Sequence, residues 1–334
     1  MQSSVSSVPA ATPSGSDRAP PALAIVVPCY NEQEVLPETK ARLAELLAGL
    51  QARGKVTEES RIYFVDDGSA DGTWSLIEGF VDDGAPVVGI RLSRNRGHQN
   101  ALLAGLFTAE GDVIVSIDAD LQDDLGAVEQ MLDHYARGCD VVYGVRRRRD
   151  TDSFAKRRAA LAFYGVMRRL GAETIRNHAD YRLLGRRAVE ALKSYREVNL
   201  YLRGIVPGLG FRSAMVEYDR LPRFAGKTKY PWRKMVSLSL NAITSFSATP
   251  LHIISAIGLL LSVASALLGL WVLFVALFTD RAVAGWASTV LPIYFLGGIQ
   301  LVSLGVIGEY VGKIYLETKG RPRFFIDCVK RRDA

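Results

Sequence analysis

The chain has 334 residues, of which 49% are hydrophobic and 23% are charged, and its formal net charge at pH 7 is +6. This composition excludes a disordered, a collagenous and a small disulfide-bonded protein, and the length suffices for two domains or for one large domain with an appendage. The three cysteines, Cys29, Cys139 and Cys328, are far apart in the sequence, which fits a reducing compartment better than a disulfide framework or a zinc site.

Residues 1–21 are rich in Ser, Ala and Pro and have no apolar run, so they predict a disordered leader and not a signal peptide. From residue 22 to about residue 220, short apolar segments alternate with segments of helical periodicity. We expect strands at 22–27 (ended by Pro28), 61–65, 87–92, 113–117 and 140–143, and helices at 37–50, 73–81, 99–109 and 125–137. This alternation predicts an α/β fold with a mostly parallel sheet and a ligand crevice at the carboxyl ends of the strands.

The hydropathy changes after Lys234. No Asp, Glu, Lys or Arg occurs at 235–279 or at 282–308, and each stretch exceeds the roughly 20 residues that cross a bilayer. We therefore expect an amphipathic interfacial helix at 231–248, a hairpin of two membrane spans at 249–316 and a basic tail at 317–334. Basic residues flank the outer ends of both spans, which predicts that both ends of the chain are cytoplasmic. The alternative is a hydrophobic helical hairpin buried in an oligomer.

The segment Asp118-Ala119-Asp120-Leu121-Gln122-Asp123 follows the expected strand at 113–117. Side chains at positions i, i+2 and i+4 of an extended segment face the same way, so Asp118, Asp120 and Gln122 would present oxygen atoms to one point. Such ligands suit Mg²⁺ or Mn²⁺ held jointly with substrate phosphates. An Asp-x-Asp pattern is often only a solvated turn, but its place after a buried strand favours the metal interpretation.

Polar residues also follow other strands. Asp66 or Asp67 would accept a hydrogen bond from a nucleobase or a ribose, and Asp71 behind them would cap the next helix; the local pattern fits binding and capping equally well. After the first strand, Tyr30 would stack on a base and Glu32 would bind a hydroxyl group. The segment 94–100 leads into a helix N-terminus, a natural place for a diphosphate, and its His98 has the features of an ordinary surface histidine.

Taken in order, these motifs resemble the family 2 glycosyltransferases with a GT-A (Rossmann-like) fold, and most closely the polyprenyl-phosphate sugar transferases. The resemblance covers residues 22–326 and rests on the segments 28–32, 66–73, 94–101, 118–123, 180–183, 225–230 and 308–322. It implies a nucleotide-sugar domain at 22–230.

The resemblance also implies roles for matched positions. The implied residues are Pro28, Tyr30, Glu32, Asp66, Asp67, Gly97, Gln99, Asn100 and Asp118 for the nucleotide-sugar, Asp118, Asp120 and Gln122 for the metal, Asp120, Asp180 and Arg182 for catalysis, and Arg146, Lys227 and Lys229 for the acceptor phosphate. Since residues 146–149 are all arginines, the sequence does not decide which of them binds the acceptor phosphate. The two lysines would alternatively anchor the chain to the membrane surface.

The activity implied by the resemblance is transfer of a sugar, with inversion, from UDP-glucose to undecaprenyl phosphate at the inner membrane, with the catalytic domain in the cytoplasm. GDP-mannose, UDP-N-acetylglucosamine and a UDP-aminoarabinose derivative stay open as donors, and so does a homo-oligomeric state. A non-enzymatic membrane scaffold is the competing class. Nucleic acid is not an expected partner, because an acidic metal motif and two membrane spans do not suit it.

Overall fold

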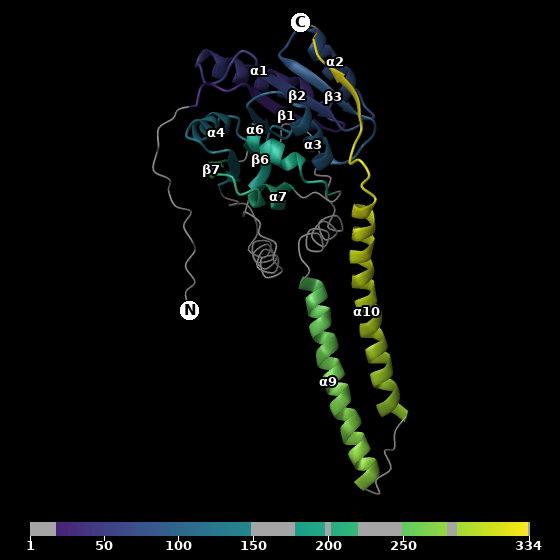
Figure 1. Cartoon of the computed structure of the whole chain (residues 1–334). Helices are drawn as coiled ribbons and strands as arrows, with labels where there is room; N and C mark the ends of the chain where they lie inside the picture. Colours follow the sequence, from purple (N-terminus) through teal and green to yellow (C-terminus); the bar gives the residue numbers. More distant parts are fainter. Residues whose placement is uncertain (1–17, 148–177, 198–201, 220–248, 279–285, 333–334) are drawn as a thin grey trace.

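The fold is described from a computed structural model, and the description covers residues 18–147, 178–197, 202–219, 249–278 and 286–332. An α/β domain forms one end of the molecule, and two long helices project from it (Figure 1). The expected interfacial helix at 231–248 and the residues Lys227 and Lys229 lie outside the described residues.

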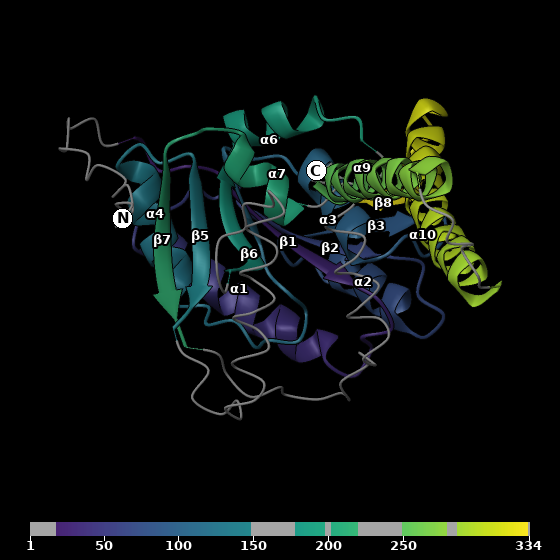
Figure 2. The same cartoon turned by 90° about the horizontal axis from the view of Figure 1, so that it is seen from below.

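The described strands form one sheet in the order β7-β5-β6-β4-β1-β2-β3-β8, whose twist is visible in Figure 2. Their bounds are β1 Leu23–Cys29, β2 Arg61–Asp66, β3 Val87–Leu92, β4 Val113–Ser116, β5 Val141–Arg146, β6 His178–Gly185, β7 Ser213–Tyr218 and β8 Ile326–Lys330. The pairs β1–β2, β1–β4, β2–β3 and β5–β7 are parallel, whereas β3–β8, β4–β6 and β5–β6 are antiparallel. The sheet is therefore mixed but mostly parallel.

Helices cover both faces of the sheet. The described helices of the domain are α1 Leu36–Ala52, α2 Thr73–Asp82, α3 His98–Thr108, α4 Ala127–Ala136, α6 Arg186–Lys193 and α7 Leu202–Gly208. Helices α1, α2 and α4 pack in one hydrophobic cluster with Leu23, Ile25 and Val27 of β1, whereas α3, α6 and α7 pack in a second cluster with Ala24 and Val26. The alternation along β1 puts successive side chains into opposite cores, as expected for a strand buried on both faces.

The first strand runs two residues further than the sequence predicts. Pro28 does not end β1, which continues to Cys29. Pairing with β4 stops at Val26, so Pro28 lies in a part of β1 whose only paired neighbour is β2. A proline without an N–H is tolerated where a strand lacks a neighbour on one side.

The two long helices are α9 Thr249–Phe278 and α10 Trp286–Thr318. Among the described residues, one segment, Phe295–Thr318, is long and apolar enough to cross a membrane, with a mean hydropathy of 1.4 and no burial inside the protein. It overlaps the second of the two expected spans, at about residues 289–310, and the first, at about residues 251–278, falls within α9.

After α10 the chain returns to the α/β domain, where β8 runs along β3 (Figure 1). The N–H of Ser93 donates to the carbonyl of Phe325 at 3.0 Å. The Lys330 ammonium lies 2.7 Å from Asp82, and the Arg331 guanidinium lies 2.8 Å from Glu110. The basic segment after α10 thus contributes an edge strand to the sheet, which charge patterning alone did not predict.

Candidate active site

The carboxyl ends of β1, β2 and β4 bring the predicted site residues to one edge of the sheet. Cys29 at the end of β1 is paired in register with Asp66 at the end of β2, and the acidic loop 118–123 follows β4 on the other side of β1. The N-terminus of α3 comes from the loop after β3. Four motifs that are far apart in the sequence therefore meet where a parallel sheet forms its ligand crevice.

Asp66 and Asp67 are both buried, and their carboxylates hold the surrounding loops. Asp67 accepts hydrogen bonds from the backbone N–H groups of Arg96 and Gly97 at 2.7 and 2.8 Å, and Asp66 accepts one from Ser69 at 3.1 Å. Burial raises the pKa of both carboxyl groups, and these hydrogen bonds act against that rise. The immediate effect of Asp67 is to fix the loop that starts α3.

Glycines shape the two loops at this point. Gly97 precedes α3 with a φ of 88°, in the left-handed region. Gly68 has a φ of 67°, and a Cβ there would lie 2.7 Å from backbone atoms of Arg94 and Asn95. The turn after β2 can therefore pack against the 94–97 loop only without a side chain. The Asn100 side chain donates to the Arg96 carbonyl at 2.8 Å, and Gln99 lies beside it in the first turn of α3.

The loop after β1 is tied to the turn after β2. Asn31, at a φ of 53°, donates its N–H to the Ser69 hydroxyl at 2.9 Å, and its side-chain oxygen accepts the N–H of Ala70 at the same distance. The N–H of Glu32 donates to the Thr73 hydroxyl. Tyr30, just before Asn31, is exposed to solvent.

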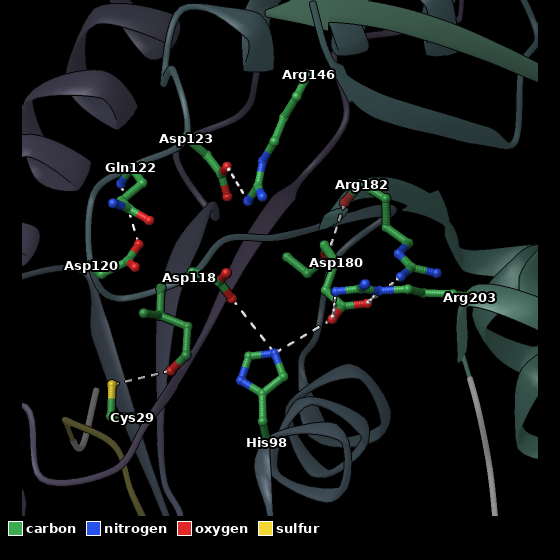
Figure 3. Close-up of polar contacts among 12 residues, drawn as sticks. Cys29, His98, Asp118, Asp120, Gln122, Asp123, Arg146, Asp180, Arg182 and Arg203 are labelled. Carbon is green, nitrogen blue, oxygen red and sulfur yellow. Dashed lines mark hydrogen bonds and ion pairs between the residues drawn. The ribbon is translucent and has the colours of Figure 1, made fainter. Parts of the chain in front are cut away.

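Hydrogen bonds shape the acidic loop after β4. The hydroxyl of Thr39, fully buried on α1, donates to the carbonyl of Ala119 at 2.8 Å, between the two aspartates. Leu121 adopts a φ of 54°, and the N–H of Gln122 donates to Asp120 Oδ1 at 3.3 Å. Figure 3 shows Asp118, Asp120 and Gln122 following one another along this loop.

The charge of this loop suits a cation. Burial and the negative charges of Asp123, Asp180 and Asp120 raise the pKa of Asp118 to about 6, although its side chain is 36% exposed. Within the described residues, no three His, Cys, Asp or Glu side chains form a candidate metal cluster; the predicted set has two carboxylates and one amide. This set of hard oxygen donors fits Mg²⁺ or Mn²⁺ with coordination positions left for phosphate oxygens.

Asp180 on β6 is the centre of a second cluster. Its carboxylate accepts a hydrogen bond from Arg182 at 2.6 Å and two from Arg203 of α7 at 3.2 and 3.0 Å. Burial by itself raises the pKa of Asp180, but the charges of Arg182 and Arg203 outweigh it and hold the pKa well below its usual range. A carboxylate of this kind is a poor proton acceptor at neutral pH and a good electrostatic anchor.

His98 joins the two clusters. Its Nε2 lies 3.5 Å from Asp118 Oδ1 and 3.8 Å from Asp180 Oδ2 (Figure 3). Sequence reasoning treated His98 as an ordinary surface residue and missed Arg203 altogether. The position of His98 inside the 94–100 motif was a sequence signal for a role in the site, whereas no motif indicated Arg203.

Arg146 stands at the end of β5, where the sequence placed it. It is 3.3 Å from Asp123, and its side chain is 22% exposed, whereas Arg147 pairs on the surface with Glu217 and Asp219. Residues 148 and 149 lie outside the described part of the chain. Of the two described arginines, Arg146 is therefore the one beside the acidic loop.

Comparisons with known proteins identify the family of this chain. Residues 24–193 match the model of the family described as glycosyl transferase family 2. An uncharacterized glycosyltransferase of Bacillus subtilis, YkoT, is 50% identical over 92% of this chain and 91% of its own length. A bactoprenol glucosyl transferase of the Shigella phage SfX is 38% identical over 92% of this chain and 99% of its own length.

A solved structure, the mannosyltransferase PcManGT of Pyrobaculum calidifontis in complex with GDP-Man and Mn²⁺, covers 87% of both chains at 17% identity with a TM-score of 0.44. The family model covers half of this chain, and the two relatives extend the likeness over nearly all of it. The GT-A-like α/β fold that the motifs predicted agrees with this family. The chain therefore belongs to glycosyl transferase family 2 and is a glycosyltransferase.

Proposed function

We propose that this enzyme transfers a sugar from a nucleotide-sugar to a polyprenyl phosphate, with UDP-glucose as the favoured donor and undecaprenyl phosphate as the acceptor. The observation that carries the proposal is the meeting of the acidic loop 118–123, the N-terminus of α3 and the Asp180 cluster at one edge of the sheet. The name of the phage SfX relative, bactoprenol glucosyl transferase, supports both the sugar and the lipid.

On the donor side, Asp118, Asp120 and Gln122 would hold Mg²⁺ or Mn²⁺. When bound, the cation neutralises the charge that develops on the departing nucleoside diphosphate. The N-terminus of α3, with Gly97, Gln99 and Asn100, would face the diphosphate, because unpaired N–H groups at a helix start favour anions. Around the nucleoside, the proposed residues are Pro28, Tyr30, Glu32, Asp66 and Asp67.

On the acceptor side, the lipid phosphate is itself the nucleophile. A phosphate monoester has a second pKa of about 6, so it is mostly ionised at neutral pH and needs no strong base. Arg146, Lys227 and Lys229 would desolvate and orient it. A direct displacement inverts the anomeric centre. Asp180, with its lowered pKa, would stabilise positive charge on the sugar or orient the acceptor, and would not remove a proton.

The membrane arrangement is part of the same proposal. The apolar segment of α10 and the helix α9 would form the two-span hairpin, the segment 231–248 would lie at the interface, and the α/β domain would remain in the cytoplasm. This arrangement places the crevice near the surface from which a lipid phosphate emerges. Residues 1–21 remain a predicted leader, although Arg18 forms an ion pair with Asp140 at 3.2 Å.

The test uses the full-length protein in detergent with undecaprenyl phosphate, Mn²⁺ and a panel of labelled sugar nucleotides. We expect a labelled glycolipid, with most product from UDP-glucose. The variant Asp120→Asn should retain the fold and lose at least about a hundredfold of the transfer, because the charge stabilisation supplied by a bound metal is worth several kcal/mol. No glycolipid from any donor, with a folded protein, would overturn the proposal and favour a non-enzymatic scaffold.

A further inference from the structure

A buried chain of hydrogen bonds joins the acidic loop to the end of β5. Oδ1 of Asp123 accepts the Tyr218 hydroxyl at 2.5 Å and Nη2 of Arg146 at 3.3 Å. Nε of Arg146 in turn donates to the Tyr218 oxygen at 3.1 Å. Burial raises the pKa of Tyr218, so the hydroxyl keeps its proton and donates it to Asp123. Figure 3 shows Arg146 reaching toward Asp123.

These contacts fix a side chain that is otherwise flexible. Arginine has several rotatable bonds, and ordering it costs conformational entropy. Here Nε and Nη2 of Arg146 are both held. Burial by itself lowers the pKa of this guanidinium, but Tyr218 and Asp123 outweigh that effect, raise the pKa and keep the side chain charged. The result is an oriented cation at the carboxyl end of β5.

Asp123 belongs to the same short loop as the predicted metal ligands. It directly follows Gln122, and the loop is shaped by the Thr39 hydroxyl at Ala119 and by the left-handed Leu121. The position of Arg146 is therefore set from the loop that carries Asp118 and Asp120, although Arg146 comes from a different strand.

The second carboxylate oxygen of Asp123 indicates that the contact of Asp123 with Arg146 and Tyr218 does more than support the fold. Oδ2 is buried and has no hydrogen-bond partner within the described residues. An unsatisfied buried carboxylate oxygen costs stability, so a pair selected only for stability would satisfy both oxygens.

We propose that Asp123 and Tyr218 are positioning residues that fix Arg146 relative to the acidic loop, so that the acceptor phosphate meets a cation at a set distance from the donor diphosphate. This inference rests on the proposed function. The competing explanation is a buried cluster that only holds β5, β7 and the acidic loop together. The two differ in which kinetic constant responds when the hydroxyl of Tyr218 is removed.

The test is Tyr218→Phe in the full-length enzyme. We expect the KM for undecaprenyl phosphate to rise about tenfold, the effect of losing one hydrogen bond to a charged group. The KM for the nucleotide-sugar and the Mn²⁺ affinity with UDP, measured by calorimetry, should stay within about twofold of the wild type, because the loop itself keeps its other contacts.

Tyr181→Phe is the matched control. Its ring meets the Tyr218 ring edge-on at 5.1 Å, and its hydroxyl donates to the Asp124 carbonyl at 2.8 Å without touching Arg146. We expect it to lower the melting temperature and leave the acceptor KM unchanged. A second check is Arg146→Lys, in whose background Tyr218→Phe should add little.

Three results would overturn the inference: an unchanged acceptor KM in Tyr218→Phe, an equal rise in both KM values, or full additivity with Arg146→Lys. Wild-type enzyme that glycosylates no polyprenyl phosphate would refute the proposed function instead.

Discussion

Replacing Thr39 with valine tests how the acidic loop is held. The Thr39 hydroxyl lies 2.8 Å from the Ala119 carbonyl and 3.1 Å from the Val35 carbonyl, which also accepts the Thr39 N–H at 3.0 Å. Valine has nearly the same shape without the hydroxyl, so Val35 keeps a donor and Ala119 loses one. Leaving a buried carbonyl unpaired costs about 1–3 kcal/mol.

Two measurements follow from this loss. The melting temperature of Thr39→Val should fall by about 2–12 °C, since 1 kcal/mol corresponds to about 2–4 °C in a domain of this size. The peptide freed by the change lies between Asp118 and Asp120, so their carboxylates should hold Mn²⁺ less firmly. We expect the affinity for Mn²⁺ in the presence of UDP, followed by electron paramagnetic resonance, to fall about threefold to tenfold.

Thr39→Ser is the control, because it keeps the donor and removes only a methyl group. It should recover the Mn²⁺ affinity while remaining less stable than the wild type by about 1 kcal/mol. If Thr39→Val bound Mn²⁺ as well as the wild type did, the hydroxyl would have no part in shaping the loop. The same conclusion would follow if serine and valine lowered the affinity equally.

Three other predictions concern charge and topology. The pKa of Asp180 is lower in the folded than in the unfolded chain, so its ionised form stabilises the fold above about pH 4, and this contribution fades as the pH falls further. The free energy of unfolding of Asp180→Asn at pH 7 should be lower than that of the wild type by roughly 3 kcal/mol. Denaturant titrations at pH 7 and pH 3 should show that this difference shrinks in acid. In Lys229→Ala, transfer to lipid should weaken while slow hydrolysis of the donor continues; equal transfer in detergent would leave membrane anchoring as the explanation. Asp280→Cys should react with an impermeant thiol reagent from outside intact cells, and labelling only after lysis would contradict the topology.

The sequence predicts the first half of the domain well because each element there carries a local signal. Helix α1 shows the reason: Leu43, Leu47 and Leu50 form a stripe at helical spacing, and all three are buried. Thr39 lies one turn earlier on that stripe, so a polar residue in an apolar face was a readable hint of a buried hydrogen bond.

The later strands were harder to predict because their partners are distant. In β6, Tyr181 and Leu183 enter one core while Asp180 and Arg182 face the other side, so an ion pair replaces the expected apolar residues. Strand β6 pairs antiparallel with both β4 and β5, and the alternation of strands and helices in the sequence does not indicate this position. His98 and Arg203 acquire Asp180 as a partner only through this position of β6.

Strand β8 ties the completion of the sheet to the order of synthesis. Its partner β3 emerges from the ribosome early, whereas residues 326–330 follow α9 and α10. Until they arrive, β3 is an open edge with unpaired backbone groups, which is an aggregation hazard. Closing a loop that spans residues 93–325 is slow on entropic grounds, unless the end of α10 first brings the strand close to its place. Under the proposed membrane arrangement, insertion of the long helices would then act as a folding step for the domain that precedes them. A chain stopped before residue 326 would leave the β3 edge without a partner strand.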